Sequence, residues 1–287
     1  MREKLLLEYG EEAERIFAGF QAERALTFRA NTLKTSAEAV ERVLLQEGIS
    51  FQRVKWYPDA FLLSPLEQSR ITQLPMYERG EIYLQSLSSM LPPLVLKPQA
   101  GERILDMTAA PGGKTTQMAA LSGGNALITA CERDSVRFQR LKYNLEKQGA
   151  TRVNAMQTDA SRLDDFFQFD KILLDAPCSG SGTFLVNKPS KISEKLMQGC
   201  IKEQRALLIK ALKLLKKGGT LLYSTCSLFK EENEFLVESV LKGTGCKWVA
   251  IEDSLLSDIP VLSGKEGTLT VCPTEQFEGF FLACIQK

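Results

Sequence analysis

Two cysteines stand in short polar segments that each follow an apolar run of the sequence. Cys178 lies in Asp-Ala-Pro-Cys, three residues after Asp175, and Cys226 lies in Ser-Thr-Cys. A thiolate is a strong nucleophile, and backbone amides, a helix N-terminus or a cation such as Lys114 can lower the pKa of a thiol. These two thiols are therefore candidates for covalent catalysis, whereas we interpret the remaining cysteines as small buried core residues.

The composition excludes several other uses of these thiols. The chain of 287 residues has no histidine, which excludes Ser-His-Asp and Cys-His pairs and a histidine base. Its seven cysteines contain no Cys-x-x-Cys pair, so we expect no metal. Scattered thiols and the lack of a long apolar run predict a cytoplasmic protein without a membrane segment. The net charge of +1 leaves any polyanion site to a local patch.

From about residue 103 onward, short apolar runs alternate with helical periodicity. We expect strands at 103–107, 126–131, 153–157, 171–175 and 220–224, and a long helix that ends at Lys217. This alternation predicts an α/β fold with a doubly wound, mostly parallel sheet that has helices on both faces. Ligands of such sheets bind beyond the carboxyl ends of the strands, where both candidate thiols lie.

The first part of the chain has a different texture. Residues 1–18 predict a short amphipathic helix, and a strand at 25–34 is followed by a helix at 36–47. The stretch 85–102 contains three prolines and predicts a connector. We therefore expect a small α+β unit over 1–84 and a larger unit over 85–287.

Acidic and glycine-rich segments follow the first three strands of the larger unit. The turn from Thr108 to Lys114 ends in Gly-Gly-Lys-Thr, but Thr108 stands where a phosphate-binding loop needs its first glycine. What remains is a turn that lets backbone approach a ligand at a helix N-terminus. Glu132 could accept hydrogen bonds from ribose hydroxyls, and Asp159 could accept one from an adenine amino group. Together they indicate a cofactor that contains adenosine and needs no pyrophosphate cradle.

Three segments, LDMTAAPGGKT, DAPCSGSGT and YSTCSLFKEENE, together resemble the Sun/Fmu (RsmB-like) family of RNA cytosine-5 methyltransferases. The resemblance implies S-adenosylmethionine as cofactor, a Rossmann-like class I methyltransferase domain over 85–287 and an RNA-binding unit over 1–84. The residues that it places at the cofactor are Thr108, Ala109, Ala110, Pro111, Gly112, Gly113 and Lys114 at the methionine part, Glu132 at the ribose, Asp159 at the adenine, and Arg137 and Asp175 beside them.

The resemblance also implies a covalent mechanism. It assigns attack on carbon 6 of cytosine to Cys226 and assistance in product release to Cys178, and it places Lys114 near the base. Asp175 could protonate or hydrogen-bond ring nitrogen 3 if burial raises its pKa. The base that removes the carbon 5 proton could be Cys178, a carboxylate, water or an RNA phosphate.

RNA contacts and partners follow from the same resemblance. The segment FRANTLK makes Arg29, Asn31 and Lys34 candidates for phosphate or base contact, and Lys188 lies in the loop after Pro-Cys. A short chain with one accessory unit resembles the tRNA-modifying members, so tRNA is favoured slightly over rRNA. We expect a monomer.

Three alternatives stay open. A catalytically silent RNA-binding or ribosome-assembly factor could keep this fold. An exocyclic amino methyltransferase would have an aromatic residue where Cys178 stands. A DNA cytosine methylase would attack from Pro-Cys, hence from Cys178, and the presence of a second thiol argues for RNA instead.

Overall fold

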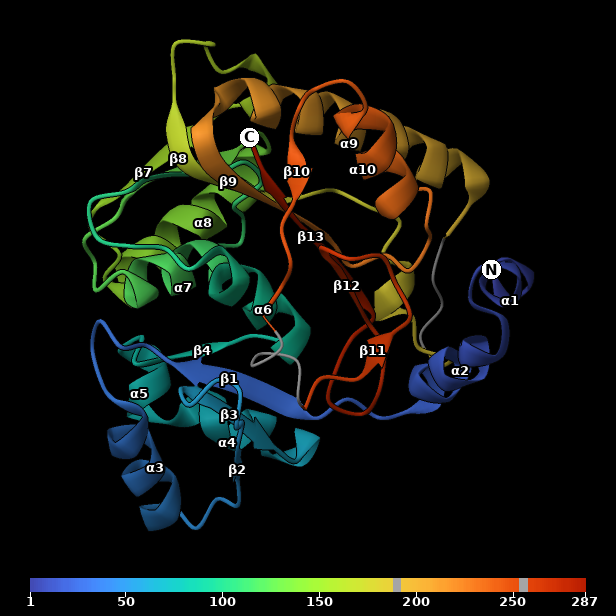
Figure 1. The fold of residues 1–287 in the computed structure, drawn as a ribbon. Coiled ribbons are helices and arrows are strands. Elements are labelled where there is room, and N and C mark those ends of the chain that lie inside the picture. The colour runs from blue at the N-terminus through green and yellow to red at the C-terminus, as the bar shows by residue number, and fades with distance from the viewer. Residues whose placement is uncertain (188–191, 253–257) are drawn as a thin grey trace.

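The computed structural model describes residues 1–187, 192–252 and 258–287. A small antiparallel sheet, ordered β2-β3-β1-β4, forms the lower part of the molecule in Figure 1. Phe28 and Phe61 stack in its core with ring centroids 5.1 Å apart. The elements of this part are β1 (Leu26–Ala30), α3 (Ala37–Gln46), β2 (Gln52–Arg53), β3 (Ala60–Leu63), η2 (Pro65–Glu67), α4 (Gln68–Gln73), α5 (Pro75–Glu78) and β4 (Ile82–Leu84).

The second sheet has nine strands, ordered β11-β12-β13-β9-β8-β5-β6-β7, with β10 paired to β13. Strands β9, β8, β5, β6 and β7 are parallel, which confirms the parallel core predicted from the alternating pattern. Its strands are β5 (Arg103–Asp106), β6 (Leu127–Glu132), β7 (Val153–Gln157), β8 (Phe169–Asp175), β9 (Leu215–Thr225), β10 (Lys247–Trp248), β11 (Val261–Leu262), β12 (Thr268–Val271) and β13 (Phe280–Gln286).

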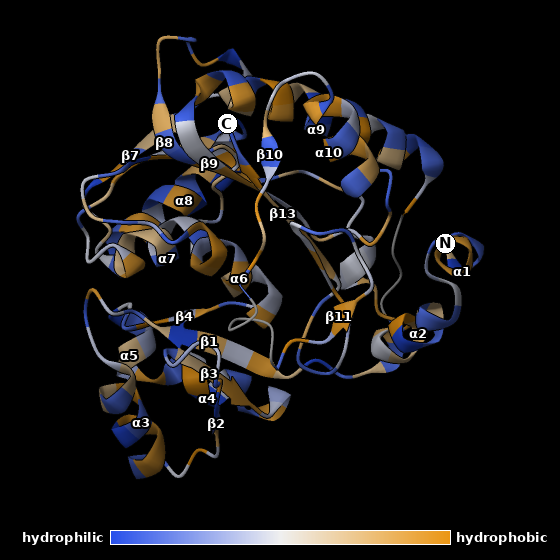
Figure 2. Cartoon of the chain, in the orientation of Figure 1, coloured by the Kyte–Doolittle hydropathy of each residue, from blue (hydrophilic) through white to orange (hydrophobic). Residues whose placement is uncertain are grey.

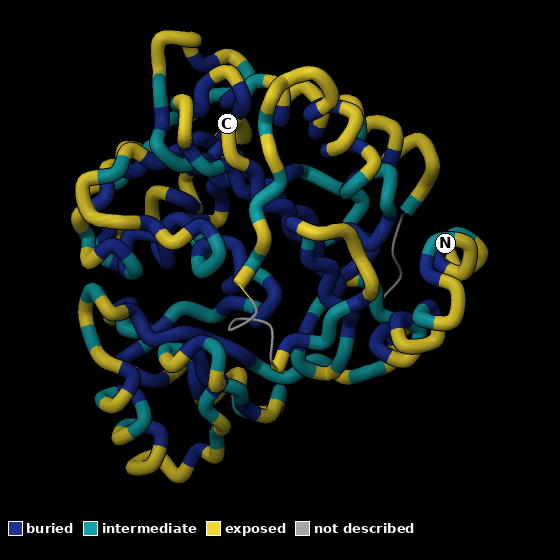
Figure 3. Tube along the Cα trace, viewed as in Figure 1, coloured by how far each residue is buried: buried dark blue, intermediate teal, exposed yellow. Residues whose placement is uncertain are grey.

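Helices cover both faces of this sheet. Leu91, Met118 and Leu141 of α6, α7 and α8 pack on one face, and Leu208 and Val237 of α9 and α10 pack on the other. Hydrophobic residues gather along these helices and strands (Figure 2), and the strands between them are buried (Figure 3). The helices are α6 (Leu87–Leu96), α7 (Gly113–Leu121), α8 (Ser135–Gln148), α9 (Glu194–Leu214) and α10 (Glu234–Leu241), with short turns η3 (Ala160–Arg162) and η4 (Ser181–Thr183).

The N-terminal helices lie apart from the small sheet. Leu5 of α1 (Arg2–Tyr9) and Ile16 of α2 (Ala13–Gln21), which are joined by η1 (Gly10–Glu12), pack with Met197 of α9 and Leu228 after β9. The small sheet itself therefore begins at β1. Over the ranges that the structure describes, no helix combines the length and the apolar composition needed to span a bilayer.

Two expectations for the larger unit need correction, and one group of strands was not predicted. The predicted connector at 85–102 contains helix α6, which has two prolines inside it. Because Pro93 has no N–H to donate, the carbonyl of Ser89 needs another partner, and the side chain of Gln85 donates to it at 2.9 Å. Helix α9 ends at Leu214 rather than Lys217, since Leu215 already pairs with Phe169 of β8. The antiparallel strands after β9 had no counterpart in the prediction.

Candidate active site

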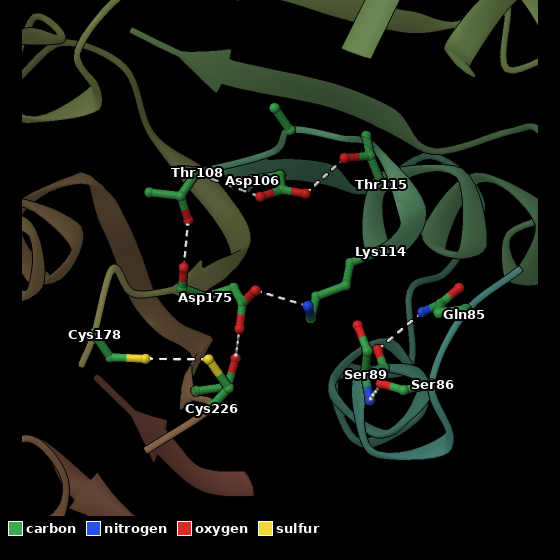
Figure 4. A network of polar contacts seen from close by, with 12 residues as sticks. Gln85, Ser86, Ser89, Asp106, Thr108, Lys114, Thr115, Asp175, Cys178 and Cys226 are labelled. Atoms are coloured by element: carbon green, nitrogen blue, oxygen red, sulfur yellow. Dashed lines mark hydrogen bonds and ion pairs between the residues drawn. The ribbon is translucent and has the colours of Figure 1, made fainter. Parts of the chain in front are cut away.

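The two candidate thiols meet at the carboxyl edge of the large sheet. Strands β8 and β9 are parallel neighbours, so the loops that follow them lie side by side. The Sγ atoms of Cys178 and Cys226 are 3.3 Å apart, within hydrogen-bonding distance (Figure 4). The pKa of Cys178 is raised well above its usual value, first by the hydrogen bond with Cys226 and then by burial. The expectation that this site lowers the pKa of Cys178 is therefore wrong.

Asp175 connects the thiols to the glycine-rich turn. Its Oδ2 accepts a hydrogen bond from Lys114 Nζ at 2.7 Å, and its Oδ1 accepts one from Ser224 Oγ at 2.7 Å. The hydroxyl of Thr108 donates to the backbone oxygen of Asp175 at 2.8 Å. Burial lowers the pKa of Lys114, but the charge and hydrogen bond of Asp175 raise it more, so the pKa lies above its usual value. Lys114 is thus held as a cation at the same edge.

The glycine-rich turn needs its glycines. Gly112 has a φ of 109°, in the left-handed region that disfavours other residues. A Cβ on Gly113 would lie 3.0 Å from Cε1 of Tyr83, so this position also accepts no side chain without movement. At the end of β5, Asp106 accepts a hydrogen bond from Thr115 Oγ1 at 2.7 Å. This bond fixes the first turn of α7 against the strand.

Two cavities adjoin at this edge and share Thr108 and Asp175. One is lined by the predicted ribose and adenine residues, namely Glu132, Arg137 and Asp159. The other contains Cys226 and residues of β4, β5, α6, α7 and β13, and its lining includes Tyr83, Gln85, Asp106, Ala109, Ala110, Pro111, Gly113, Lys114 and Phe280. Most of the turn thus faces the cavity of the thiol, and Thr108 faces both cavities.

The acidic residues of the first cavity are fixed by local hydrogen bonds. Glu132 is buried, and its Oε1 accepts from the backbone N–H of Asp134 at 2.9 Å. Arg137 donates to the backbone oxygen of Ala110 at 2.9 Å and lies 3.5 Å from Glu132 Oε2. Asp159 caps η3 by accepting from Ser161 N at 2.9 Å. Each carboxylate therefore keeps capacity for a further hydrogen bond to a ligand.

The predicted RNA contacts need correction. Arg29 and Asn31 are both fully buried. Arg29 donates to Gln85 Oε1, Gly113 O and Thr116 Oγ1 at 2.9, 3.1 and 2.8 Å. Asn31 donates to the backbone oxygens of Gly80 and Gln148, each at 2.8 Å. These side chains join the small sheet to α7 and α8 and are not available to an RNA molecule in this structure.

The other two predicted contacts have different outcomes. Lys34 is exposed, but its Nζ donates to the backbone oxygens of Arg79 and Lys147 at 2.8 and 2.7 Å, so the amine already holds the same junction. Lys188 lies outside the described residues.

Three site residues were missed in the sequence. Ser224 precedes Thr-Cys and holds Asp175. Asp106 ends the strand before the glycine-rich turn. Glu232 stands in the Lys-Glu-Glu-Asn run after β9 and contacts the loops of both thiols. The signal for Glu232 was an acid six residues after Cys226, within a segment already quoted for its resemblance.

Asp106 predicts a pH dependence of stability. Burial raises its pKa to about 6 from 3.8, against the hydrogen bond from Thr115. The folded state therefore holds this proton more tightly than the unfolded state, and the contribution to stability present below pH 4 is lost as pH rises through 6. Between pH 4 and 7, the free energy of unfolding should fall by about 3 kcal/mol more in wild type than in Asp106→Asn. Urea unfolding at several pH values measures this.

The exposed Asp164→Asn is the matched control for that titration. Its pH profile should follow wild type. Identical profiles for Asp106→Asn and wild type would show that Asp106 titrates in the folded protein as it does in the unfolded chain.

The fold and the placement of the site define the class of this protein. It is a Rossmann-like class I methyltransferase with a small N-terminal unit. A solved methyltransferase homologue from Pyrococcus horikoshii is 35% identical with a TM-score of 0.86, covering 99% of this chain and 93% of that chain. NSun6 from the same organism, solved with SFG, is 25% identical with a TM-score of 0.87, covering 100% and 97%.

The family follows from the sequence comparisons. The family model of the 16S rRNA methyltransferase RsmB/F matches residues 93–286, and that of the N-terminal domain of 16S rRNA methyltransferase RsmF matches residues 2–87. The chain belongs to the RsmB/F methyltransferase family, which confirms the Sun/Fmu resemblance.

Curated relatives agree with this assignment. Ribosomal RNA small subunit methyltransferase F of Shewanella sp. (strain ANA-3) is 35% identical over 272 residues, covering 91% of this chain and 56% of that protein. The 28S rRNA (cytosine-C(5))-methyltransferase of Mus musculus is 36% identical over 226 residues, covering 76% of this chain and 28% of that protein. The chain thus spans about half the length of its bacterial relatives.

Proposed function

We propose that this chain transfers a methyl group from S-adenosylmethionine to carbon 5 of a cytosine in ribosomal RNA, through a covalent bond to Cys226. The observation that supports this most directly is the pair of thiols 3.3 Å apart. Cys226 lines a cavity that shares Asp175 with the cavity of Glu132 and Asp159. A base held in one cavity would therefore meet a methyl donor held in the other.

The residues of the first cavity fit the proposed cofactor. S-adenosylmethionine supplies an activated methyl group on a sulfonium. The carboxylates of Glu132 and Asp159 would accept hydrogen bonds from ribose hydroxyls and the adenine amino group. Asp175 and Thr108 border both cavities and would lie beside the methionine part. SFG, an analogue of S-adenosylmethionine, in the NSun6 neighbour supports the same cofactor here.

Each catalytic side chain has a defined task in this proposal. The thiolate of Cys226 adds to carbon 6 of the ring, which makes carbon 5 nucleophilic enough to take the methyl group. Loss of the carbon 5 proton then lets the carbon–sulfur bond break and returns the thiolate. Lys114 fixes the carboxylate of Asp175, which would accept a hydrogen bond from ring nitrogen 3 when that nitrogen is protonated. Cys178 assists release, and its raised pKa keeps it as a thiol beside the nucleophile.

Ribosomal RNA is the proposed substrate class because the named relatives act on it. Both the bacterial and the mouse relative carry ribosomal RNA in their names. The slight preference for tRNA, which came from chain length, has no support among these relatives. The target base has to leave its stack to reach thiols inside a cavity, so a flipped or looped cytosine is expected.

The test is methylation with labelled S-adenosylmethionine and separate pools of unmodified ribosomal RNA and tRNA. We expect label in 5-methylcytosine of the ribosomal pool and a covalent protein–RNA complex that survives denaturation. Label in tRNA alone would reverse the substrate class. RNA binding without label in either pool would contradict the proposed activity and favour the silent RNA-binding factor.

Cofactor binding gives a separate prediction. Glu132→Gln should weaken binding of S-adenosylmethionine by roughly 10- to 100-fold, since a hydrogen bond to a charged group contributes about 1.5–3 kcal/mol. Calorimetry measures this without RNA. Glu203→Gln, at a half-buried position in the lining of the same cavity where it pairs with Arg133, should change affinity by less than about threefold. If Glu132→Gln and wild type bind S-adenosylmethionine with equal affinity, Glu132 does not contact the cofactor.

A further inference from the structure

Glu232 is a fully buried carboxylate between the loops of the two thiols. Its Oε1 accepts from the backbone N–H of Ser179 at 2.8 Å and from Gln204 Nε2 at 3.2 Å. Its Oε2 accepts from the hydroxyls of Ser179 and Ser227, each at 2.6 Å. Both oxygens thus have two donors, and over the described ranges no lysine or arginine forms an ion pair with the carboxylate.

The positions of these donors are informative. Ser179 directly follows Cys178, and Ser227 directly follows Cys226. The side chain of Glu232, in the segment before α10, therefore holds the residue next to each thiol. The two thiols are 48 residues apart in the sequence. Burying a carboxylate without a cation costs several kcal/mol unless its hydrogen bonds are satisfied. Here four donors satisfy both oxygens, so the acid draws together the groups that donate to it, two of which come from the loops of the thiols.

Further hydrogen bonds connect the loops of the two thiols and fix Glu232 in place. The hydroxyl of Ser181 accepts from Leu228 N at 2.9 Å and lies 3.0 Å from the hydroxyl of Ser227. Tyr223 donates to the backbone oxygen of Glu232 at 2.7 Å, which fixes the acid to β9 itself. Gly182 N also donates to Cys226 O at 2.9 Å. The Glu232 carboxylate bonds the residue directly after each thiol.

We propose that Glu232 is a positioning residue that holds the Cys178 loop against the Cys226 loop, so that the two thiols stay in contact during the reaction. The role of this contact in product release rests on the proposed function. The geometry can be tested without that function, because two thiols in contact form a disulfide readily. In that reaction the thiols lose two electrons and two protons to glutathione disulfide, which leaves as two molecules of glutathione.

The experiment measures the equilibrium between the reduced protein and the Cys178–Cys226 disulfide in glutathione buffers, with the linked peptides identified by mass spectrometry. We expect Glu232→Ala to lower this equilibrium constant by about tenfold or more, and Glu232→Gln to stay within about threefold of wild type. The glutamine keeps the shape, and the serine hydroxyls can rotate to accept from its amide. Glu231→Ala, which loses the ion pair with Lys4 and a hydrogen bond with Glu8, is the matched control.

A second variant covers failure of Glu232→Ala to fold. The double substitution Ser179→Ala and Ser227→Ala removes both contacts to Oε2 and should also lower the disulfide equilibrium, by about threefold or more. An unchanged equilibrium in folded Glu232→Ala, or in the double variant, would overturn the proposal. So would an equal loss in Glu231→Ala.

Methylation assays separate this inference from the proposed function. In Glu232→Ala we expect a lower kcat and accumulated covalent RNA complex, with an unchanged KM for S-adenosylmethionine. The glutamine variant should restore release. Wild type that forms the disulfide but methylates no RNA would defeat the proposed function and leave the positioning role supported. If wild type is active but its disulfide equilibrium does not depend on Glu232, the proposed function is supported and the positioning role is defeated.

Discussion

Cys226→Ala should lower methyl transfer to RNA on the order of 10⁴-fold, the scale of loss when a covalent mechanism loses a key group. Without the thiolate, no bond forms at carbon 6 and carbon 5 stays a poor nucleophile. Binding of S-adenosylmethionine should not change, because Cys226 does not line the cavity of Glu132 and Asp159. Single-turnover transfer and calorimetry measure the two properties separately.

Cys178→Ala provides the complementary result. It should form the covalent RNA complex and fail to release it, so a gel-stable adduct accumulates that Cys226→Ala cannot form. Cys246→Ala, a partly buried thiol near β10, is the control and should behave as wild type. An adduct formed by Cys226→Ala but not by Cys178→Ala would exchange the two roles, as in the DNA methylase alternative.

Arg29→Ala should lower the free energy of unfolding by about 3 kcal/mol, since it leaves a large cavity and acceptors without donors. Arg29 is fully buried and links β1 to Gln85 and to the first turn of α7. Its guanidinium also lies 5.2 Å from the ring centroid of Tyr83. Arg29 is thus a central member of the group of side chains that joins the small sheet to the methyltransferase domain, and the loss should be large.

Urea unfolding checks this expectation, with Trp56, which lies between β2 and β3 and packs against Phe277, reporting on the contact between the two parts and Trp248 on β10. Lys34→Ala is the matched control from the same segment, and its loss should stay below about 1 kcal/mol because the amine is exposed. A variant Arg29→Ala with unchanged stability and weaker RNA binding would instead support the original interpretation of Arg29 as an RNA contact.

The sequence predicted those parts of the molecule that depend on local pattern. Apolar runs at 103–107 and 171–175 become β5 and β8, and parallel pairing then brings the segments after them to one edge. The proximity of Cys178 and Cys226 follows in the same way from the parallel pairing of β8 with β9. Their distance of 3.3 Å does not, because it depends on side-chain contacts made by Glu232.

The incorrect predictions concern residues whose hydrogen-bond partners are distant in the sequence. Arg29 and Asn31 look like surface residues because their acceptors lie 56, 84 and 117 residues away. The prolines of α6 predict a break, but the Ser89 carbonyl that Pro93 leaves free is satisfied from outside the helix, by the side chain of Gln85. Long-range polar partners of this kind cannot be read from composition or periodicity.

The shared wall of Thr108 and Asp175 suggests a route to inhibitors. Because the two cavities meet there, a single molecule that joins a cytidine-like ring to an adenosyl group by a short linker would occupy both. Tethering the two halves makes the second binding event intramolecular, so the affinity of the joined molecule should exceed that of either half. Its linker would lie over Asp175, and the required linker length would measure the path of the methyl group.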